Sequence, residues 1–321
     1  MNWKKIMPLI GIIILIIILT TVDFNQIKDI FLEINPIYSF LSFFLILPLV
    51  IIANIEWQIL LKKQKIDVKF SYTVKNFFIG YFYGFISPGA LGAYTRAIYL
   101  ADESQDPLPK CFSNIVILNT IDYLALLILG AIGAIYLSSR FPYLFISILI
   151  VTAFILVLFF FFFFKREKSK AFFTRIIRSR VFSTLKHRLE GYIDSFYEDL
   201  PRFRDVLIPF SISILSWILK YIMIFYIATL FKIEIPMIDL ILILAVSDVV
   251  ASAPISIYGL GTRELSLLSL LSIFSVTKEQ VVSLSLFLFV ILWLFPSIIG
   301  AIVTIFETKR FEKIKKLQEN I

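Results

Sequence analysis

Apolar residues run along the chain in eight long segments, and shorter polar stretches separate them. Most segments contain about the 20 apolar residues that an α-helix needs to cross the hydrocarbon core of a bilayer. A helix satisfies its own backbone hydrogen bonds, which lipid cannot do for it. The pattern predicts an all-α polytopic membrane protein, with residues 1–321 as a single integral membrane domain. The segments cover residues 6–22, 37–61, 76–100, 112–137, 142–164, 206–231, 237–276 and 281–306.

Two of these segments contain a break in the helical pattern. "SPGALG" interrupts residues 76–100, and "APISIYGLGTRE" interrupts residues 237–276. Both breaks combine proline with closely spaced glycine, the residues that end helices most effectively. In each an arginine enters the next helix, which makes a weak internal repeat; two ordinary turns between helices are the alternative interpretation. The break residues are Pro88, Gly89, Gly92, Pro254, Gly259 and Gly261.

The distribution of Lys and Arg among the connections predicts the orientation, because cytoplasmic connections are enriched in these residues. Residues 62–75 carry five of them, the 165–205 connection carries eleven, and the tail after Phe306 carries five. These basic connections should be cytoplasmic, and so should both termini. All of them can lie on the cytoplasmic side only if each broken segment enters and leaves the membrane on the same face. We therefore expect about six transmembrane helices plus two oppositely inserted re-entrant helical hairpins. The acidic 101–110 connection gives this scheme no support.

The 165–205 connection carries its own pattern. Apolar residues recur there at mostly helical spacing with Lys and Arg between them, which is typical of a basic amphipathic helix on an anionic leaflet. A solvated helical hairpin packed on the protein is the alternative. The apolar positions are Phe173, Ile177, Val181, Leu185, Leu189, Ile193 and Phe196.

Composition narrows the classes of function. Cys111 and His187 are the only residues of their types, so we expect no metal site, no disulfide framework and no cofactor. The net charge of +8 indicates orientation and contact with anionic lipid rather than nucleic acid. No nucleophile–base pair or phosphate-binding glycine loop is recognisable, so we expect no enzymatic activity.

Three charged residues lie far from any predicted membrane surface. Lys220 is near the centre of its apolar segment, where a lipid-facing lysine costs about 2.5–3.5 kcal/mol. It should face the interior of the helix bundle, with an acidic partner or an anionic ligand. Asp122 and Asp248 are the available carboxylates. A purely structural Lys–Asp pair is the alternative, because buried pairs often only compensate each other.

Arg96 and Arg263 each follow a break and so begin a half-helix. The first turn of a helix offers unpaired N–H groups and a positive dipole end, and an arginine adds a planar fork for phosphate oxygens. Both sites suit the phosphate of a lipid headgroup. We expect Glu264 either to hold Arg263 in place or to pair with an ammonium on the ligand. The alternative is that each arginine reaches to its own headgroup layer.

The stretches "NFFIGYFYGFISPGALGAYTRAIYL" and "APISIYGLGTRE" resemble the transmembrane region of lysylphosphatidylglycerol synthase, a flippase-like family. The resemblance covers about residues 6–306, and the second motif is the more specific. Two positions depart from the family pattern. Of an "ERxxD"-like motif only Asp122 is present, and Ala93 stands where an acidic residue often follows the first glycine.

The resemblance implies a lipid flippase of the cytoplasmic membrane, acting on aminoacylated phosphatidylglycerol or a polyprenyl-phosphate carrier. The larger synthases add a soluble aminoacyl-transfer domain, which we expect to be missing because the chain ends fifteen residues after Phe306. Anionic membrane lipids are the expected partners. Two alternatives stay open: a membrane-embedded enzyme acting on lipid-linked glycans or phospholipids, and an accessory subunit that holds a lipid-modifying enzyme.

Overall fold

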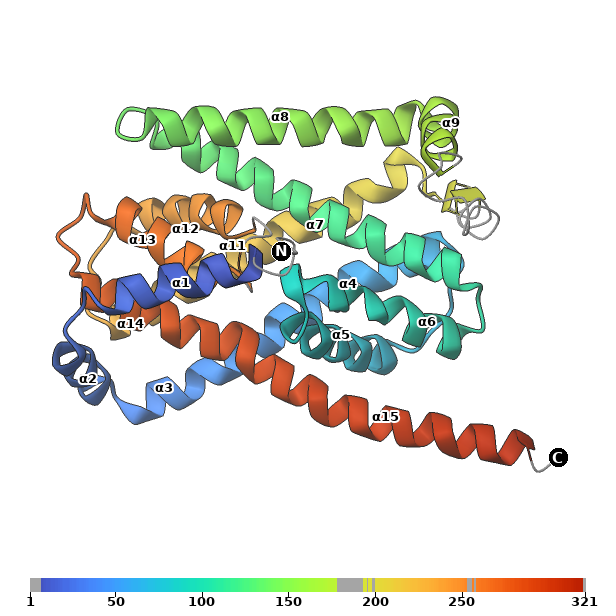
Figure 1. Cartoon of the computed structure of the whole chain (residues 1–321), viewed down its shortest axis with the longest axis horizontal. Coiled ribbons are helices and arrows are strands. Elements are labelled where there is room, and N and C mark those ends of the chain that lie inside the picture. Colours follow the sequence, from blue (N-terminus) through green and yellow to red (C-terminus); the bar gives the residue numbers. More distant parts are fainter. Residues whose placement is uncertain are drawn as a thin grey trace. The chain divides into compact units, whose positions relative to one another are not determined.

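The described part of the computed structural model is built of helices (Figure 1). Every regular element in its described part is a helix, which confirms the predicted all-α class. The structure describes residues 7–177, 193–194, 196–197, 200–252, 256 and 258–319. The chain divides into two compact units: the first comprises Met1–Ile51, Ser71–Arg96 and Ile218–Ile321, and the second comprises Ile52–Phe70 and Ala97–Trp217.

Five helical stretches of the described chain are long and apolar enough to cross a membrane. They coincide with five of the six predicted full spans. Neither broken segment is among them, which agrees with the interruptions seen in the sequence. The five stretches are Pro36–Lys63, Leu108–Tyr136, Pro142–Phe161, Phe203–Leu230 and Lys278–Glu307.

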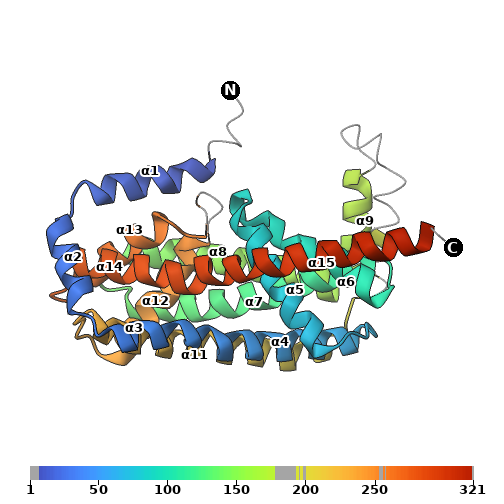
Figure 2. The same ribbon diagram turned by 90° about the horizontal axis from the view of Figure 1, so that it is seen from below.

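The first predicted span, residues 6–22, ends earlier than expected, and the chain turns sharply after it. Helix α1 (Met7–Leu19) is followed by α2 (Phe24–Glu33) at an angle of 88° (Figure 2). Asp23 starts the second helix, because its Oδ1 accepts a hydrogen bond of 2.8 Å from the N–H of Asn25. Together α1 and α2 count as a sixth membrane span only if the bent pair is treated as a single span.

Two of the five long stretches change helix type along their length. Residues 36–63 consist of α3 (Pro36–Ser42), the 3₁₀ turn η2 (Phe43–Leu45) and α4 (Ile46–Lys63). Residues 278–307 lie in α14 (Lys278–Phe289), the π-helical turn η5 (Val290–Leu294) and α15 (Phe295–Glu319). Because π-helical turns inside α-helices are frequent at functional sites, η5 is of interest for the site described below.

The first unit contains both helix breaks. The first break separates α5 (Phe70–Phe85) from the 3₁₀ helix η3 (Pro88–Thr95), and the second separates α12 (Met237–Ala251) from α13 (Thr262–Leu271). Helices α12 and α13 pack against each other, and α13 also packs against α1 and α14. Among the described residues of the second break, Ser256, Gly259 and Gly261 are buried.

The second unit contains α6 (Arg96–Ser104) from Ala97 onward, α7 (Leu108–Tyr136), α8 (Pro142–Phe164) and α9 (Arg166–Ile177). Helices α7 and α8 pack along each other. A buried polar chain holds α4 and α7 together: Trp57 donates to Asn114 at 2.7 Å, and Asn114 donates to Gln64 at 2.6 Å. Helix α11 (Phe203–Leu230) contributes residues to both units.

The 165–205 connection is only partly described. Helix α9 forms its beginning, Arg166 donates to the carbonyl oxygen of Pro201 at 2.6 Å, and Ser169 is fully buried. Three of the predicted amphipathic positions, Val181, Leu185 and Leu189, lie outside the described residues. The amphipathic membrane-surface helix therefore stays a prediction.

Candidate functional site

The second break depends on backbone conformations that favour glycine. Tyr258, Gly259 and Gly261 have φ values of 50°, 80° and 86°, all in the left-handed region. A Cβ at position 261 would also collide with the backbone carbonyl of Gly11. Glycine at 261 thus allows both the turn and the close approach of α1. The predicted break residue Pro254 lies outside the described residues.

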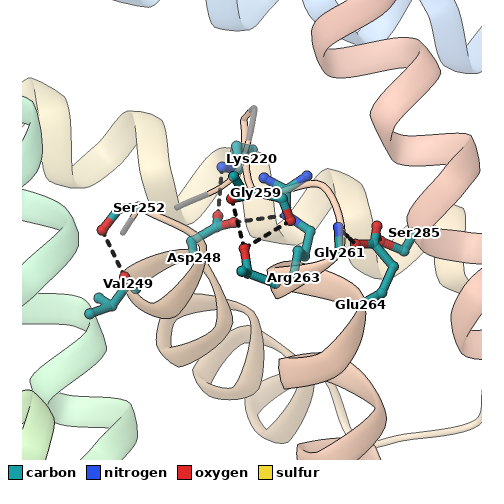
Figure 3. A network of polar contacts seen from close by, with 11 residues as sticks. Lys220, Asp248, Val249, Ser252, Gly259, Gly261, Arg263, Glu264 and Ser285 are labelled. Carbon is teal, nitrogen blue, oxygen red and sulfur yellow. Dashed lines mark hydrogen bonds and ion pairs between the residues drawn. The ribbon is translucent and has the colours of Figure 1, made fainter. Parts of the chain in front are cut away.

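Glu264 closes the N-terminus of α13. One oxygen of its carboxylate accepts a hydrogen bond of 2.5 Å from the N–H of Gly261, and the other accepts one of 2.6 Å from the Ser285 hydroxyl (Figure 3). The residue is 1% exposed. Both oxygens therefore have a partner within the protein, and the carboxylate positions the start of α13.

Lys220, Asp248 and Arg263 form a buried charge network at the same break. Their side chains come from α11, α12 and α13 and point toward one another (Figure 3). Lys220 Nζ lies 2.7 Å from Asp248 Oδ2, and Arg263 Nε lies 3.4 Å from Asp248 Oδ1. Of the two carboxylates considered for Lys220, Asp248 is the one that pairs with it. One carboxylate thus faces two cations.

The guanidinium of Arg263 is only partly engaged. The residue is 8% exposed, and its contacts in the described chain are the ion pair through Nε and a cation–π contact with the Trp293 ring at 5.7 Å. Its two Nη atoms consequently have no hydrogen-bond partner among the described residues. A guanidinium with unused donors can donate two parallel hydrogen bonds to an oxyanion, the bidentate geometry that arginine favours.

A row of aromatic rings runs between the two predicted arginines. Arg96 lies over Phe77 at 5.9 Å, Phe77 contacts Tyr81 at 5.2 Å, and Tyr81 contacts Trp293 at 5.8 Å, so that the row ends at the ring beside Arg263. Trp293 belongs to the π-helical turn η5. The row thus connects Arg96, which follows the first break, with Arg263, which follows the second.

The first break turns the chain back along α5. The N–H of Gly92 donates to the Ser87 hydroxyl at 2.6 Å, and the amide of Asn76 donates to the carbonyl oxygen of Arg96 at 3.0 Å. A Cβ at Gly80 would lie 2.5 Å from Cδ of Arg96, so the arginine side chain packs directly on α5. The predicted break residues Pro88 and Gly89 begin η3.

The two breaks meet through Tyr258. Its hydroxyl lies against Gly84, at a place where a Cβ would collide with it, and its ring stacks on Phe85 at 6.5 Å and on Trp293 at 4.3 Å. Tyr258 and Trp293 were not among the predicted site residues. The turn "YGLG" marks a break but gives no signal that its tyrosine reaches another helix.

Asp122 lies in the second unit. Its Oδ1 accepts a hydrogen bond of 2.9 Å from Trp217 Nε1, and one turn earlier on α11 the Ser213 hydroxyl donates to Glu56 at 2.8 Å. Glu56, which was not predicted, is 3% exposed. No group of three or more His, Cys, Asp or Glu that could hold a metal ion occurs among the described residues.

Helices of membrane-spanning length, two broken helices and a buried charge network define a multi-pass membrane protein with an internal polar site. The chain belongs to the family described as lysylphosphatidylglycerol synthase TM region, whose profile matches residues 7–300. The resemblance noted from the two broken motifs is thereby confirmed. A comparison with curated proteins finds no match.

Proposed function

We propose that this protein holds an anionic lipid by its headgroup phosphate and moves that headgroup across the membrane without a chemical step. The observation that supports this most is the Arg263 guanidinium, which is 8% exposed and has two Nη atoms without a hydrogen-bond partner in the described chain. Its Nη atoms are not among the buried atoms that lack a partner, so they remain accessible to a ligand. A phosphate oxygen is the ligand that its geometry suits best.

Asp248 keeps the site assembled when no lipid is bound. Its contact with Lys220 is short, at 2.7 Å, whereas its contact with Arg263 is longer, at 3.4 Å, and uses only Nε. A lipid phosphate can therefore bond the Nη atoms while the Lys220–Asp248 pair stays intact. In this mechanism only the headgroup enters the polar site, and the acyl chains remain in the bilayer.

The two breaks are proposed to be re-entrant hairpins inserted from opposite faces of the cytoplasmic membrane, with both termini in the cytoplasm. Paired broken helices that meet in the interior are typical of transporters. The contact of Tyr258 with Gly84 brings the two breaks together, and the aromatic row joins Arg96 to Arg263. Arg96 is then a second headgroup contact on the way across.

The proposal is tested with the purified full-length chain in vesicles of phosphatidylcholine that contain a trace of fluorescent phosphatidylglycerol. A membrane-impermeant quencher reports how fast lipid from the inner leaflet reaches the outer one. The parent should accelerate this exchange, and Arg263→Gln should slow it about 10–100-fold, because hydrogen bonds to charged groups contribute about 1.5–3 kcal/mol.

Arg140→Gln is the matched control, since Arg140 is exposed and lies in the turn between α7 and α8. It should exchange lipid at the parent's rate. A parent that does not accelerate exchange, or an Arg263→Gln variant as fast as the parent, would contradict the proposed function.

A further inference from the structure

A buried carboxyl group of the second unit has no part in the proposed headgroup site. Glu56 of α4 is 3% exposed, and its Oε1 accepts a hydrogen bond of 2.8 Å from the Ser213 hydroxyl of α11. In the part of the chain that the structure describes, no Lys or Arg forms an ion pair with Glu56. This sets it apart from Asp248, which faces two cations.

Glu56 lies well inside a helix of membrane-spanning length. Lys63 at the end of α4 pairs at 3.0 Å with Asp205 near the start of α11, so this pair marks the same end of both helices. Glu56 precedes Lys63 by seven residues, and Ser213 follows Asp205 by eight. At a rise of 1.5 Å per residue, both lie about 10–12 Å from the ion pair along their helices. The Glu56 carboxyl group is therefore at the depth of the hydrocarbon core, which is about 30 Å thick.

The charged group that acts on Glu56 is another carboxylate, Asp122 of α7. Asp122 accepts a hydrogen bond of 2.9 Å from Trp217, which follows Ser213 by one turn of α11. The two carboxyl groups thus face neighbouring turns of one helix, where like charges repel each other. An isolated carboxylate in a medium of low dielectric constant takes up a proton rather than remain charged. Glu56 is the more buried of the two, so this argument applies most strongly to it.

We propose that Glu56 is a proton-binding site, whose carboxyl group is protonated at neutral pH and exchanges its proton with water. Oε2 carries the proton, because it has no hydrogen-bond partner in the described chain and is not among the fully buried atoms there. On uptake an O–H bond forms at Oε2 and a hydronium ion becomes water; release reverses both changes.

This proposal goes beyond the proposed function, because it gives the protein a second ligand, a proton, bound by residues that take no part in holding the headgroup. Asp and Glu residues inside membrane-spanning segments form the proton relays of pumps and transporters. Glu56 thus provides a group through which a proton gradient can act on this protein.

Infrared spectroscopy of the full-length protein in a maltoside detergent, which has no carbonyl group, tests the proposal. The C=O stretching band of a protonated carboxyl group lies apart from the bands of a carboxylate. Exposed Glu residues do not contribute at pH 7, because their pKa is normally about 4.3. The parent should show the band at pH 7 and lose it reversibly under alkaline conditions. Glu56→Gln should lack the intensity of one carboxyl group at pH 7.

Two further variants show that the band belongs to Glu56. Glu234→Gln, at an exposed position, is the matched control and should keep the parent's band. Ser213→Ala removes the hydrogen bond to Oε1, which is the carbonyl oxygen when Oε2 is protonated. It should therefore move the band to higher frequency without removing it, a change that a merely structural role of Glu56 would not produce.

A band as strong in Glu56→Gln as in the parent would overturn the proposal. So would a band that Asp122→Asn removes and Glu56→Gln retains, because the proton would then belong to Asp122. If Glu56→Gln does not fold, Ser213→Ala decides, and an unchanged band frequency would count against Glu56. The spectra involve no movement of lipid, so a failure of the proposed function leaves this test intact.

Discussion

The two helix breaks of the first unit share a sequence pattern, with proline and glycine followed by arginine, but they hold their arginines differently. After the second break Arg263 faces the Asp248 carboxylate, and Glu264 closes the first turn of its helix. After the first break Arg96 packs its side chain on Gly80 and lies over Phe77. The helix η3 at that break has no side-chain cap at its N-terminus.

The difference shows that a break and an arginine do not define a site by themselves. Arg263 is held by a carboxylate that it shares with Lys220, so a ligand anion can take over part of its coordination. Arg96 is 6% exposed, packs against Gly80 and lies over the Phe77 ring. The buried charge network at the second break makes it the candidate for the main binding site.

The largest expected effect comes from removing the shared carboxylate. Asp248→Asn leaves Lys220 and Arg263 buried without their counter-charge and should lower the free energy of unfolding by about 3–5 kcal/mol. Chemical denaturation in detergent micelles measures this loss. The double variant Asp248→Asn, Lys220→Met removes one unmatched cation and should recover part of the stability. A double variant no more stable than the single one would show that the charges are not the cause.

A second comparison uses one glycine from each break. Alanine at 261 would meet the carbonyl of Gly11, and alanine at 92 would meet the carbonyl of Tyr83, but only position 261 also has a positive φ, of 86°. Overpacking costs about 1–3 kcal/mol, and the left-handed conformation adds about 1–2 kcal/mol for a residue with a Cβ. Gly261→Ala should therefore unfold at lower denaturant than Gly92→Ala. The reverse order would contradict the importance of the left-handed turn.

The smallest expected effect concerns Glu264. Glu264→Gln keeps an acceptor for the N–H of Gly261, and the Ser285 hydroxyl can turn to accept from the new amide, so the loss should be about 1 kcal/mol. Glu234→Gln, at an exposed position, serves as the control and should match the parent. A loss for Glu264→Gln as large as that for Asp248→Asn would mean that its charge, and not its capping role, matters most.

Much of the fold follows from apolar length and from helix-breaking residues. Five of six predicted full spans coincide with helices long enough to cross a membrane, and Pro and Gly mark both breaks. The first segment shows the limit of counting apolar residues. Its helix ends at Leu19 because Asp23 caps a new helix in another direction, a signal that is polar, local and easily missed beside a long apolar run.

The candidate site was predictable only in part. The cost of burying Lys220 indicated an acidic partner and left Asp122 and Asp248 as choices, and the structure pairs it with Asp248. The partners Tyr258 and Trp293 carry no local signal, since aromatic residues are common in this chain and their contacts join distant segments. Sequence patterns report periodicity along one helix, whereas these contacts depend on how helices pack.

The most direct test of the central claim is a solid-state NMR measurement of dipolar coupling between arginine side-chain nitrogen and lipid phosphorus. The full-length protein, labelled with ¹⁵N-arginine, is placed in bilayers of phosphatidylcholine and phosphatidylglycerol. We predict a coupling consistent with hydrogen-bonded Nη–phosphate contacts, weaker in Arg263→Lys than in the parent and unchanged in Arg140→Lys. A coupling that Arg263→Lys leaves unchanged, or no coupling in the parent, would contradict a phosphate site at Arg263.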